Sequence, residues 1–466
     1  MNDLQELVAE RLHQDIPVVV ERDDIMEPLP RPARFNRVQI ICGMRRSGKT
    51  FYLFQLMNHL LEDGLPKKLL FYFDFSDDRL PTTEPRLMDA VLEEYWRQVP
   101  EARSQGCYLF LDEVQDCPNW QGTCRRIAEN ETVTLCITGS SSKVSSEGIA
   151  TDFRGRSHVH EMLPCSFGEF LRFHEELLPR GTTAESCIED VREDAVPPQE
   201  RTALEALFDR YLVIGGFPGI QKDTPAARLE VLQGYVRDVV SRDVADRMSI
   251  GPALAHQAAL FVLRNTSCET SVNSVKEALQ EGGGSIGWET TSQMIQLLEQ
   301  AYLFFEVHEY SKGMLPNRRN PPKYYAVDPG LAFSVSRASQ EDAGKRLETA
   351  AFLELKRRMA GRRADSISSW TEAGKRGRKV DFLVGESFAG EGTASDPYLL
   401  LQVSLSLASE KTRRREIASL DAAFEATGLP EGTIVTLREE EDCLSEHGKV
   451  YIVPAWKWFL SRQNAS

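Results

Sequence analysis

The feature that most constrains the fold is the segment "RVQIICGMRRSGKTFYLF", residues 37–54, in which an apolar run leads into the spacing G-x-x-x-x-G-K-T. Glycines at these positions let backbone N–H groups turn inward around phosphate oxygens, and a helix that begins there adds its positive dipole end. The lysine and threonine after the second glycine are suited to bind the terminal phosphates and Mg²⁺. The segment therefore predicts a site for ATP and Mg²⁺, with these contacting residues: Gly43, Arg46, Ser47, Gly48, Lys49, Thr50 and Phe51.

An acidic pair follows the apolar run in "CYLFLDEVQD", residues 107–116. Asp112 stands at the end of the expected strand, where it is placed to hold Mg²⁺ together with Thr50. Glu113 is placed to orient and deprotonate a water molecule that attacks the terminal phosphate. A kinase takes its nucleophile from a second substrate and does not need this glutamate, so the pair favours hydrolysis.

Polar residues also end a further apolar run, "LCITGSSSK", residues 135–143. A hydroxyl at this position can sense the γ phosphate or the water, and Ser140 is the candidate. The segment "TDFRGRS" then supplies Arg154 and Arg156. An arginine that reaches the γ phosphate of a neighbouring subunit stabilises transition-state charge, which would require a homo-oligomer; the alternative is a surface arginine in an ion pair. The predicted catalytic residues are Lys49, Glu113, Ser140 and Arg156.

The order of apolar runs and helix-like segments predicts four regions. Strands alternate with helices at 49–63, 85–98 and 119–130, which is typical of a parallel sheet covered by helices, so residues 1–160 are expected to be an α/β core. Residues 161–250 are expected to be a helical lid, with a mobile acidic insertion at 181–200. Residues 251–335 show three helices and a hairpin, which resembles a winged helix. Residues 336–466 are expected to form a separate small α/β domain.

Composition limits the classes of protein and of partner. A net charge of −15 argues against general nucleic-acid binding, although it permits a local basic face. The nine cysteines are scattered without C-x-x-C spacing, which argues against a disulfide framework and against zinc. No apolar run approaches the length of a membrane span, and the polar start is unlike a signal peptide. We therefore expect a cytoplasmic protein without membrane contact.

Several motifs occur together in an order that resembles a known family: "GMRRSGKT", "LFLDEVQ", "ITGSSSK", "PCSFGEFL", "GGFP" and "KYYAVDPGL". They are similar to those of prokaryotic AAA-type ATPases of the AAA_14 group with a carboxy-terminal DUF4143 region. The resemblance implies an ASCE/AAA-type P-loop core, a helical lid, a winged helix and a final α/β domain similar to the PD-(D/E)XK nuclease fold. Genome mobility and phage defence are roles suggested for related families.

A nuclease of that fold needs an acid on a helix, an acid on a strand, and an acid-x-lysine pair on the next strand. Glu348 or Glu354 can supply the first, Asp381 the second and Gln402 part of the third. Ser404 stands where the lysine is needed, so the pattern is incomplete. Lys379, two residues before Asp381, shares its strand face by the alternation of side chains and could approach the site.

Two basic runs, residues 375–379 and 413–415, could follow a phosphate backbone or could be solvated faces. The third helix of the expected winged helix has no lysine or arginine, which disfavours reading of the DNA major groove.

Three functions are compatible with these features. The first is Mg²⁺-dependent ATP hydrolysis that is coupled to a nuclease-like domain facing DNA. The second is a nucleotide-gated scaffold that binds a partner without hydrolysis. The third is a metal-dependent DNA nuclease whose access is gated by ATP.

Overall fold

The computed structural model describes residues 2–23, 26, 28–81, 83–139, 153, 155–248, 250–283, 286–310, 320–336, 340–360, 367–372, 377–385 and 399–461. The chain folds into two compact units, residues 1–162 and 163–466. In the part of the chain that is described, no helix is both long and apolar enough to cross a bilayer. The nine cysteines are free thiols, and seven of them are buried.

The first unit is built on a parallel sheet of five strands in the order β2-β3-β4-β1-β5. The strands are β1 (Val38–Cys42), β2 (Leu70–Asp74), β3 (Cys107–Asp112), β4 (Val133–Gly139) and β5 (Ser157–Glu161). The first four are the strands that the sequence predicts, and the parallel α/β core is confirmed. The fifth was not predicted, because Val159 is the only apolar residue of β5 and no apolar run marks it.

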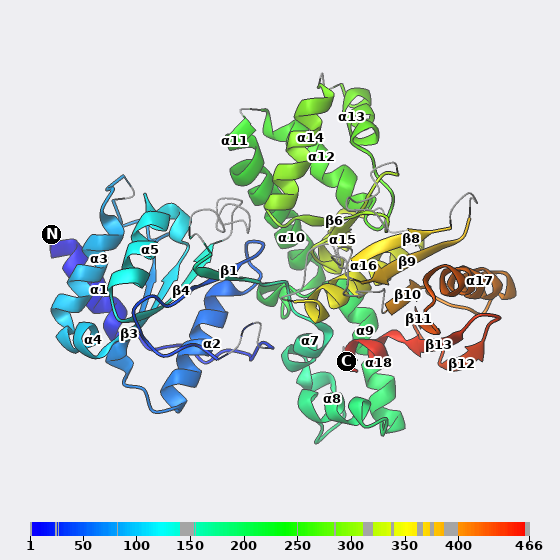
Figure 1. The fold of residues 1–466 in the computed structure, drawn as a ribbon, viewed down its shortest axis with the longest axis horizontal. Helices are drawn as coiled ribbons and strands as arrows, with labels where there is room; N and C mark the ends of the chain where they lie inside the picture. The colour runs from blue at the N-terminus through cyan, green and yellow to red at the C-terminus, as the bar shows by residue number, and fades with distance from the viewer. Residues whose placement is uncertain are drawn as a thin grey trace. The chain divides into compact units, whose positions relative to one another are not determined.

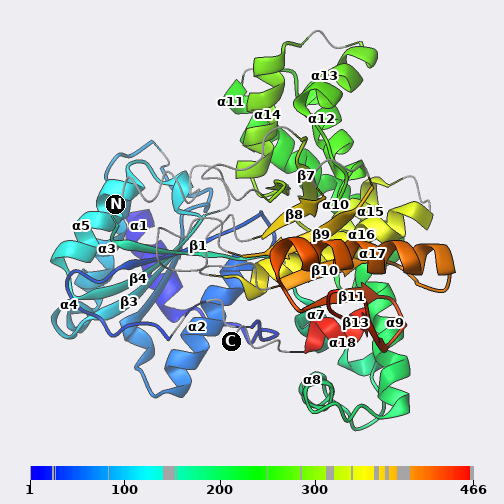
Figure 2. The same ribbon diagram turned by 45° about the vertical axis from the view of Figure 1, so that its right-hand side comes forward.

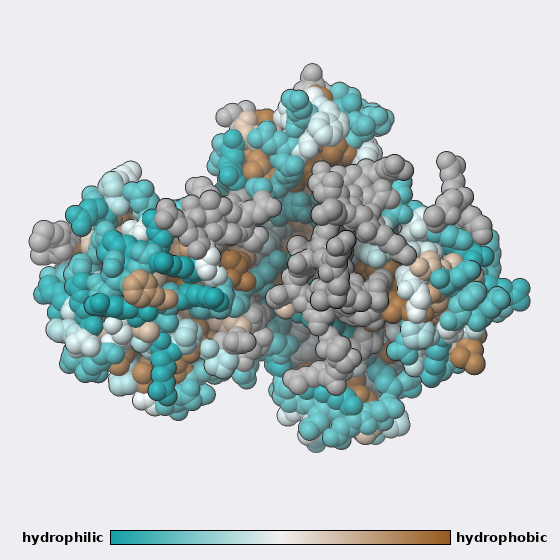
Figure 3. All heavy atoms as spheres, in the orientation of Figure 1, coloured by the Kyte–Doolittle hydropathy of each residue, from teal (hydrophilic) through white to brown (hydrophobic). Residues whose placement is uncertain are grey.

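Helices cover both faces of this sheet (Figure 1). They are α1 (Asn2–His13), α2 (Lys49–Glu62), α3 (Leu87–Gln98), α4 (Pro100–Gln105) and α5 (Trp120–Asn130), with short 3₁₀ turns at Lys67–Leu69 and Val114–Asp116. One apolar core joins the sheet to α1, α3, α4 and α5, and a second joins its other face to α2 and to the segment before β1. Alternation along β1 explains this division, since Ile40 lies in the first core and Ile41 in the second. The visible outer face of this unit is mostly hydrophilic (Figure 3).

The second unit begins with helices, as the sequence predicts for the lid. They are α7 (Phe167–Phe173), α8 (Ala184–Arg192), α9 (Pro198–Ile214), α10 (Pro225–Val239), a π-helical stretch (Val240–Ala245) and α11 (Asp246–Met248), with 3₁₀ turns at Glu175–Leu177 and Pro218–Ile220. The predicted mobile insertion at 181–200 is wrong, because α8 lies within it. Thr183 caps α8 in a capping box with Ser186, and the buried side chains of α8 are Ala184, Cys187, Ile188 and Val191. This spacing marks an amphipathic helix that packs on the core.

Three helices and a hairpin follow, in the predicted order. They are α12 (Pro252–Arg264), α13 (Val272–Glu281), α14 (Trp288–Gln300), β6 (Phe304–Val307) and β7 (Lys323–Ala326), and α15 (Pro329–Val335) comes next. Their assignment to the winged-helix class is not confirmed and stays a prediction. Backbone hydrogen bonds from Tyr310 to Ser369 and from Ser369 to His308 join the end of β6 to the sheet that follows.

That sheet has six strands in the order β12-β13-β11-β10-β9-β8, of which β10, β11 and β13 are parallel to one another. Its elements are α16 (Gln340–Arg358), β8 (Ile367–Thr371), β9 (Lys379–Val384), β10 (Leu399–Val403), α17 (Glu410–Thr427), β11 (Glu431–Thr436), β12 (Glu441–Leu444), β13 (Lys449–Pro454) and α18 (Ala455–Leu460). Figure 2 shows α17 running across β9, β10 and β11. A small α/β region is therefore present, whereas its identity as a nuclease fold is not confirmed.

The last helix packs back on the first helices of the second unit. Phe459 of α18 contacts the rings of Phe208 and Tyr211 on α9. This return explains why residues 163–466 form one compact unit, while their division into lid, winged helix and final domain stays a prediction. The boundary predicted after residue 160 lies close to the end of the first unit at Met162.

Candidate functional sites: a phosphate loop and a carboxylate–lysine cluster

The loop between β1 and α2 requires glycine at both ends of the motif. Gly43 has φ +148°, and a Cβ atom there would lie 2.3 Å from the carbonyl oxygen of Met162, which is shorter than any normal contact. Gly48, the residue before α2, has φ +106°. Arg46 between them also has positive φ, at 71°. These conformations turn the backbone into a tight loop at the start of α2, as the motif predicts.

Lys49 is buried at this loop, with only 4% of its surface exposed. Its ammonium group donates hydrogen bonds to the carbonyl oxygens of Gly43 at 3.1 Å and Met44 at 3.0 Å. Burial lowers the pKa of Lys49, and the nearby carboxylates of Glu113 and Asp112 oppose that effect. The lysine is therefore a desolvated cation that is held by neutral groups.

The carboxylate of Asp112, at the end of β3, accepts hydrogen bonds from hydroxyl groups on both neighbouring strands. Tyr72 of β2 donates to its Oδ2 at 2.9 Å, and Thr138 of β4 donates to its Oδ1. Burial raises the pKa of Asp112, while hydrogen bonds from Thr138 and Thr50 act to lower it. The hydroxyl of Thr50 and the carboxylate of Asp112 thus meet, and they form the hard oxygen donor set that suits Mg²⁺.

Glu113 follows directly in a left-handed conformation, with φ 49° and ψ 45°. Its backbone N–H donates to Oγ1 of Thr138 at 3.1 Å, and its carboxylate accepts a hydrogen bond from Gln115. A non-glycine residue adopts this conformation at a cost of roughly 1–2 kcal/mol, and such strain is typical of functional sites.

Two more predicted contacts lie on the loop and at the start of α2. Ser47 is buried, and its carbonyl oxygen accepts a hydrogen bond from Arg22 at 2.9 Å. Arg22 is in turn fixed by reciprocal backbone-to-side-chain bonds with Gln55 of α2, each 2.8 Å long. Phe51 is 57% exposed and packs edge-on against Phe54. The supporting role of Arg22 was not predicted, because no motif marks it.

The remaining predicted residues of the first unit are not brought to the loop by any described contact. Ser140 and Arg154 lie outside the described residues. Arg156 is exposed, pairs with Glu129 of α5, and lies 6.0 Å from the ring of Phe35. Its role toward a neighbouring subunit stays a prediction.

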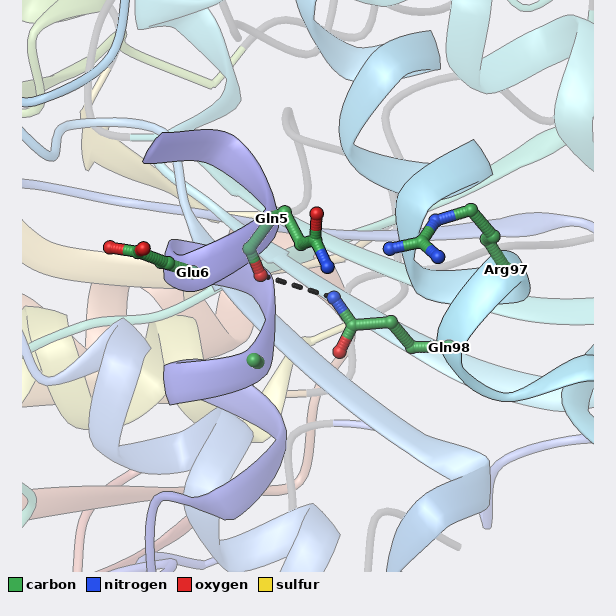
Figure 4. Close-up of a pocket in the computed structure, with 5 residues that line it drawn as sticks. Gln5, Glu6, Arg97 and Gln98 are labelled. Atoms are coloured by element: carbon green, nitrogen blue, oxygen red, sulfur yellow. Dashed lines mark hydrogen bonds between the residues drawn. The ribbon is translucent and has the colours of Figure 1, made fainter. Parts of the chain in front are cut away.

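A separate open cavity of about 570 Å³ lies between α1 and α3. It is lined by Gln5, Glu6, Ala9, Arg97 and Gln98, and the amide of Gln98 donates to the carbonyl oxygen of Gln5 at 3.1 Å (Figure 4). None of the lining residues belongs to the phosphate loop or to the strand ends around Asp112.

In the second unit, the structure brings Glu348 of α16 and Asp381 of β9 together around a lysine. The ammonium of Lys323, on β7, lies 2.8 Å from Oε1 of Glu348 and 2.9 Å from Oδ1 of Asp381. The hydroxyl of the buried Tyr325 donates to the same Glu348 oxygen at 2.8 Å. Burial and then Asp381 raise the pKa of Glu348 to about 7. Glu348 and Asp381 thus lie against the same ammonium group, while their role in a nuclease site stays a prediction. Lys323 was not predicted, because its strand belongs to the region interpreted as a winged helix.

Gln402 of β10 lies beside Asp381 and is held at both ends. Its carbonyl oxygen accepts the backbone N–H of Asp381 at 3.0 Å, and its amide donates to Glu416 at 2.9 Å. The alternative helix acid, Glu354, pairs instead with Arg358 at 2.9 Å. We call Lys323, Tyr325, Glu348, Asp381 and Gln402 the carboxylate–lysine cluster.

Lys379 does not reach this cluster, because it is half exposed and pairs with Glu269. The other described cations of the two basic runs also have carboxylate partners. The pairs are Arg378–Glu372, Arg413–Glu441, Arg414–Glu410 and Arg415–Glu416. Lys375 and Arg376 lie outside the described residues. This pairing favours solvated, charge-balanced faces over a continuous track for phosphates.

Two family models match different parts of the chain. Residues 35–171 match the family AAA_14, described as an AAA domain. Residues 205–342 match DUF8612, a domain of unknown function. The predicted DUF4143 region is therefore not confirmed, since the second matching family is a different one.

Two curated relatives are uncharacterized proteins. One, from Methanocaldococcus jannaschii, is 29% identical over 457 residues, which cover 95% of this chain and 91% of that protein. The other, from Haemophilus influenzae, is 24% identical over 345 residues, covering 73% of this chain and 79% of that protein. A Walker-type ATPase of Pyrococcus abyssi is similar in structure with a TM-score of 0.39 and 13% identity, over 64% of this chain and 91% of that one.

The family match covers β1, β3, β4 and the phosphate loop, and the parallel sheet around them agrees with it. The first unit thus carries an AAA-type domain with a P-loop ATPase-like fold.

Proposed function

We propose that the first unit binds ATP with Mg²⁺ and hydrolyses it. The observation that carries this proposal is the meeting of four groups at one edge of the sheet. Lys49 and Thr50 begin α2, and Asp112 and Glu113 end β3, with Thr50 hydrogen-bonded to Asp112 and Lys49 within the electrostatic influence of both acids. Ligands of open parallel sheets bind at this carboxyl edge.

Each group has a distinct role in this proposal. Backbone N–H groups of residues 43–50 receive the phosphates, and Lys49 exchanges its two carbonyl partners for phosphate oxygens. Thr50 and Asp112 would hold Mg²⁺, which neutralises phosphate charge when it is bound. Tyr72 and Thr138 fix the carboxylate of Asp112 in place.

Glu113 acts as the base for the attacking water. The water oxygen forms a bond to the γ phosphorus while the bond from that phosphorus to the β,γ-bridging oxygen breaks. The proton of the water passes to Glu113, and ADP and phosphate leave.

The test measures ATP binding and phosphate release with and without Mg²⁺, in the wild type and in Asp112→Asn. We expect Mg²⁺-dependent release in the wild type and loss of that dependence in the variant. Asp78→Asn serves as the matched control, since Asp78 is an exposed aspartate of the same unit. Failure of the wild type to bind ATP would contradict the proposal, and binding without release would favour the nucleotide-gated scaffold.

The wider role of the protein stays a prediction. We propose that nucleotide state is coupled to the second unit, and phosphate release with and without double-stranded DNA tests whether DNA is the partner that senses it. A homo-oligomer and a cytoplasmic location are predicted from sequence only.

A further inference from the structure

The carboxylate–lysine cluster is nearly closed to solvent. The side chains of Lys323, Glu348 and Asp381 are 14%, 15% and 13% exposed. Tyr325 is fully buried, and its ring stacks on Phe352 at a centroid distance of 4.5 Å. Charges in such a place require partners, because each has lost most of its water.

Four of the oxygens that a metal ion would use already accept hydrogen bonds from protein donors. Oδ1 of Asp381 accepts Lys323, and Oδ2 accepts the backbone N–H of Val403 at 3.1 Å. The carbonyl oxygen of Gln402 accepts the N–H of Asp381, and its amide is fixed by Glu416. Oε1 of Glu348 accepts two donors, Lys323 and Tyr325. Gln402 therefore cannot turn its oxygen to a metal without breaking the bonds at both ends of its amide.

The position between the two acids is itself taken by a positive charge. The ammonium nitrogen of Lys323 is almost equally far from Glu348 and Asp381, at 2.8 and 2.9 Å. Mg²⁺ and Mn²⁺ require several oxygen ligands near the metal. A divalent ion between these acids would have to displace the ammonium and would be repelled by it. The residues present do not fit the metal that a nuclease of this kind uses.

We propose that the ammonium of Lys323 is the permanent cation of this cluster and excludes divalent metal from it. The ion pairs of the cluster then connect three elements, because Lys323 lies on β7, Glu348 on α16 and Asp381 on β9. They hold the β6–β7 hairpin against the final sheet, beside the backbone bonds that join His308 and Tyr310 to Ser369. This role does not depend on ATP hydrolysis by the first unit.

The experiment follows the thermal midpoint of the full chain, without nucleotide, as MnCl₂ is titrated to millimolar concentration. The proteins compared are the wild type, Lys323→Met, Asp381→Asn and the double variant. Removal of the lysine leaves two buried acids that can bind Mn²⁺, and a ligand that binds only the folded state raises the midpoint. We expect a saturable rise of at least about 2 °C in Lys323→Met, no such rise from this cluster in the wild type, and loss of the rise in the double variant.

Lys379→Met is the matched control, since Lys379 is a lysine next to the cluster on β9 whose partner is Glu269. It should respond to Mn²⁺ as the wild type does. Any Mn²⁺ binding by the first unit is common to all variants and cancels in the comparison. A wild-type response that Asp381→Asn abolishes would overturn the proposal even if Lys323→Met failed to fold. A folded Lys323→Met without a response would overturn it as well.

Discussion

Each unit buries a lysine near two carboxylates, yet the two lysines are held by different partners. Lys49 of the first unit donates to neutral backbone carbonyls, and burial lowers its pKa despite the acids nearby. Lys323 of the second unit donates directly to two carboxylates. Burial acts to lower the pKa of Lys323 too, but Asp381 and Glu348 outweigh it and the pKa is raised.

This difference separates a lysine that can bind an anionic ligand from a lysine whose charge is already neutralised by two carboxylates. The charge of a buried ammonium that is bound only to neutral carbonyls is not neutralised. Binding to phosphate oxygens therefore stabilises it through charge-assisted hydrogen bonds. An ammonium between two carboxylates has its charge already compensated, and any ligand must first break strong charge-assisted bonds. The same residue types therefore favour ligand binding in one unit and cohesion in the other.

The largest expected effect tests the first half of this comparison. Lys49→Ala removes the cation at the phosphate loop, so kcat/KM for ATP should fall by roughly 10³-fold or more, about 4 kcal/mol. Steady-state phosphate release together with binding of a fluorescent ATP analogue measures the loss. Lys67→Ala is the control, since Lys67 is a partly exposed lysine of the same unit, paired with Asp15 at 3.5 Å.

A change of less than threefold in Lys49→Ala would mean that the carbonyl-held lysine does not bind phosphate. The comparison between the two lysines would then fail.

The next largest expected effect tests whether Lys323 stabilises the second unit. Lys323→Met leaves Glu348 and Asp381 buried without their cation, and removal of one partner of a buried ion pair costs about 3 kcal/mol. Denaturant unfolding followed by circular dichroism measures the loss. Lys379→Met should cost less than about 1 kcal/mol, because its pair with Glu269 is about half exposed. Equal costs for the two variants would show that the cluster is no stronger than a surface pair.

A third prediction sharpens the assignment of roles among the acids of the first unit. Glu113→Gln keeps the shape of the side chain but removes the base, so kcat should fall about 100-fold, near 3 kcal/mol, while ATP affinity changes less than threefold. Single-turnover phosphate release and equilibrium binding separate the two quantities. A parallel loss of affinity would instead place Glu113 among the binding groups.

The sequence predicts the parts of these sites that are set by residues close together along the chain, and it does not predict the parts that depend on contacts between distant segments. The loop at 43–50 and the pair Asp112 and Glu113 could be predicted because a local spacing sets the geometry of a turn and of a strand end. Tyr72 and Thr138 could not, since their strands read as apolar core and only the strand order brings their hydroxyl groups beside Asp112. Strand order is a tertiary property that one sequence does not encode in any short pattern.

The second unit shows the same limit more clearly. The order of its helices and strands could be predicted from the periodicity of apolar residues. The proximity of Glu348 and Asp381 could be predicted from the resemblance to a nuclease. The decisive residue, Lys323, belongs to a hairpin that was interpreted as part of another domain. The apolar spacing of α8 was present in the sequence, but the acidic and proline-containing composition around it favoured a mobile segment.

The smallest expected effect is a pH dependence of stability from Asp328, a buried carboxylate that is held by backbone N–H groups and not by a lysine. Asp328 accepts the N–H groups of Gly216 at 2.6 Å and Leu331 at 2.8 Å, yet burial raises its pKa to about 6. The folded chain therefore holds a proton between about pH 4 and 6 that the unfolded chain has released, so the stability contributed by Asp328 is present at low pH and is lost as the pH rises through 6. Asp328→Asn cannot titrate but can still accept one N–H group. The thermal midpoint of the wild type relative to this variant should fall by roughly 2–5 °C between pH 4.5 and 7.5. Identical pH profiles for the two proteins would show instead that the backbone N–H groups offset the burial of Asp328 and keep its pKa near the ordinary value of an aspartate.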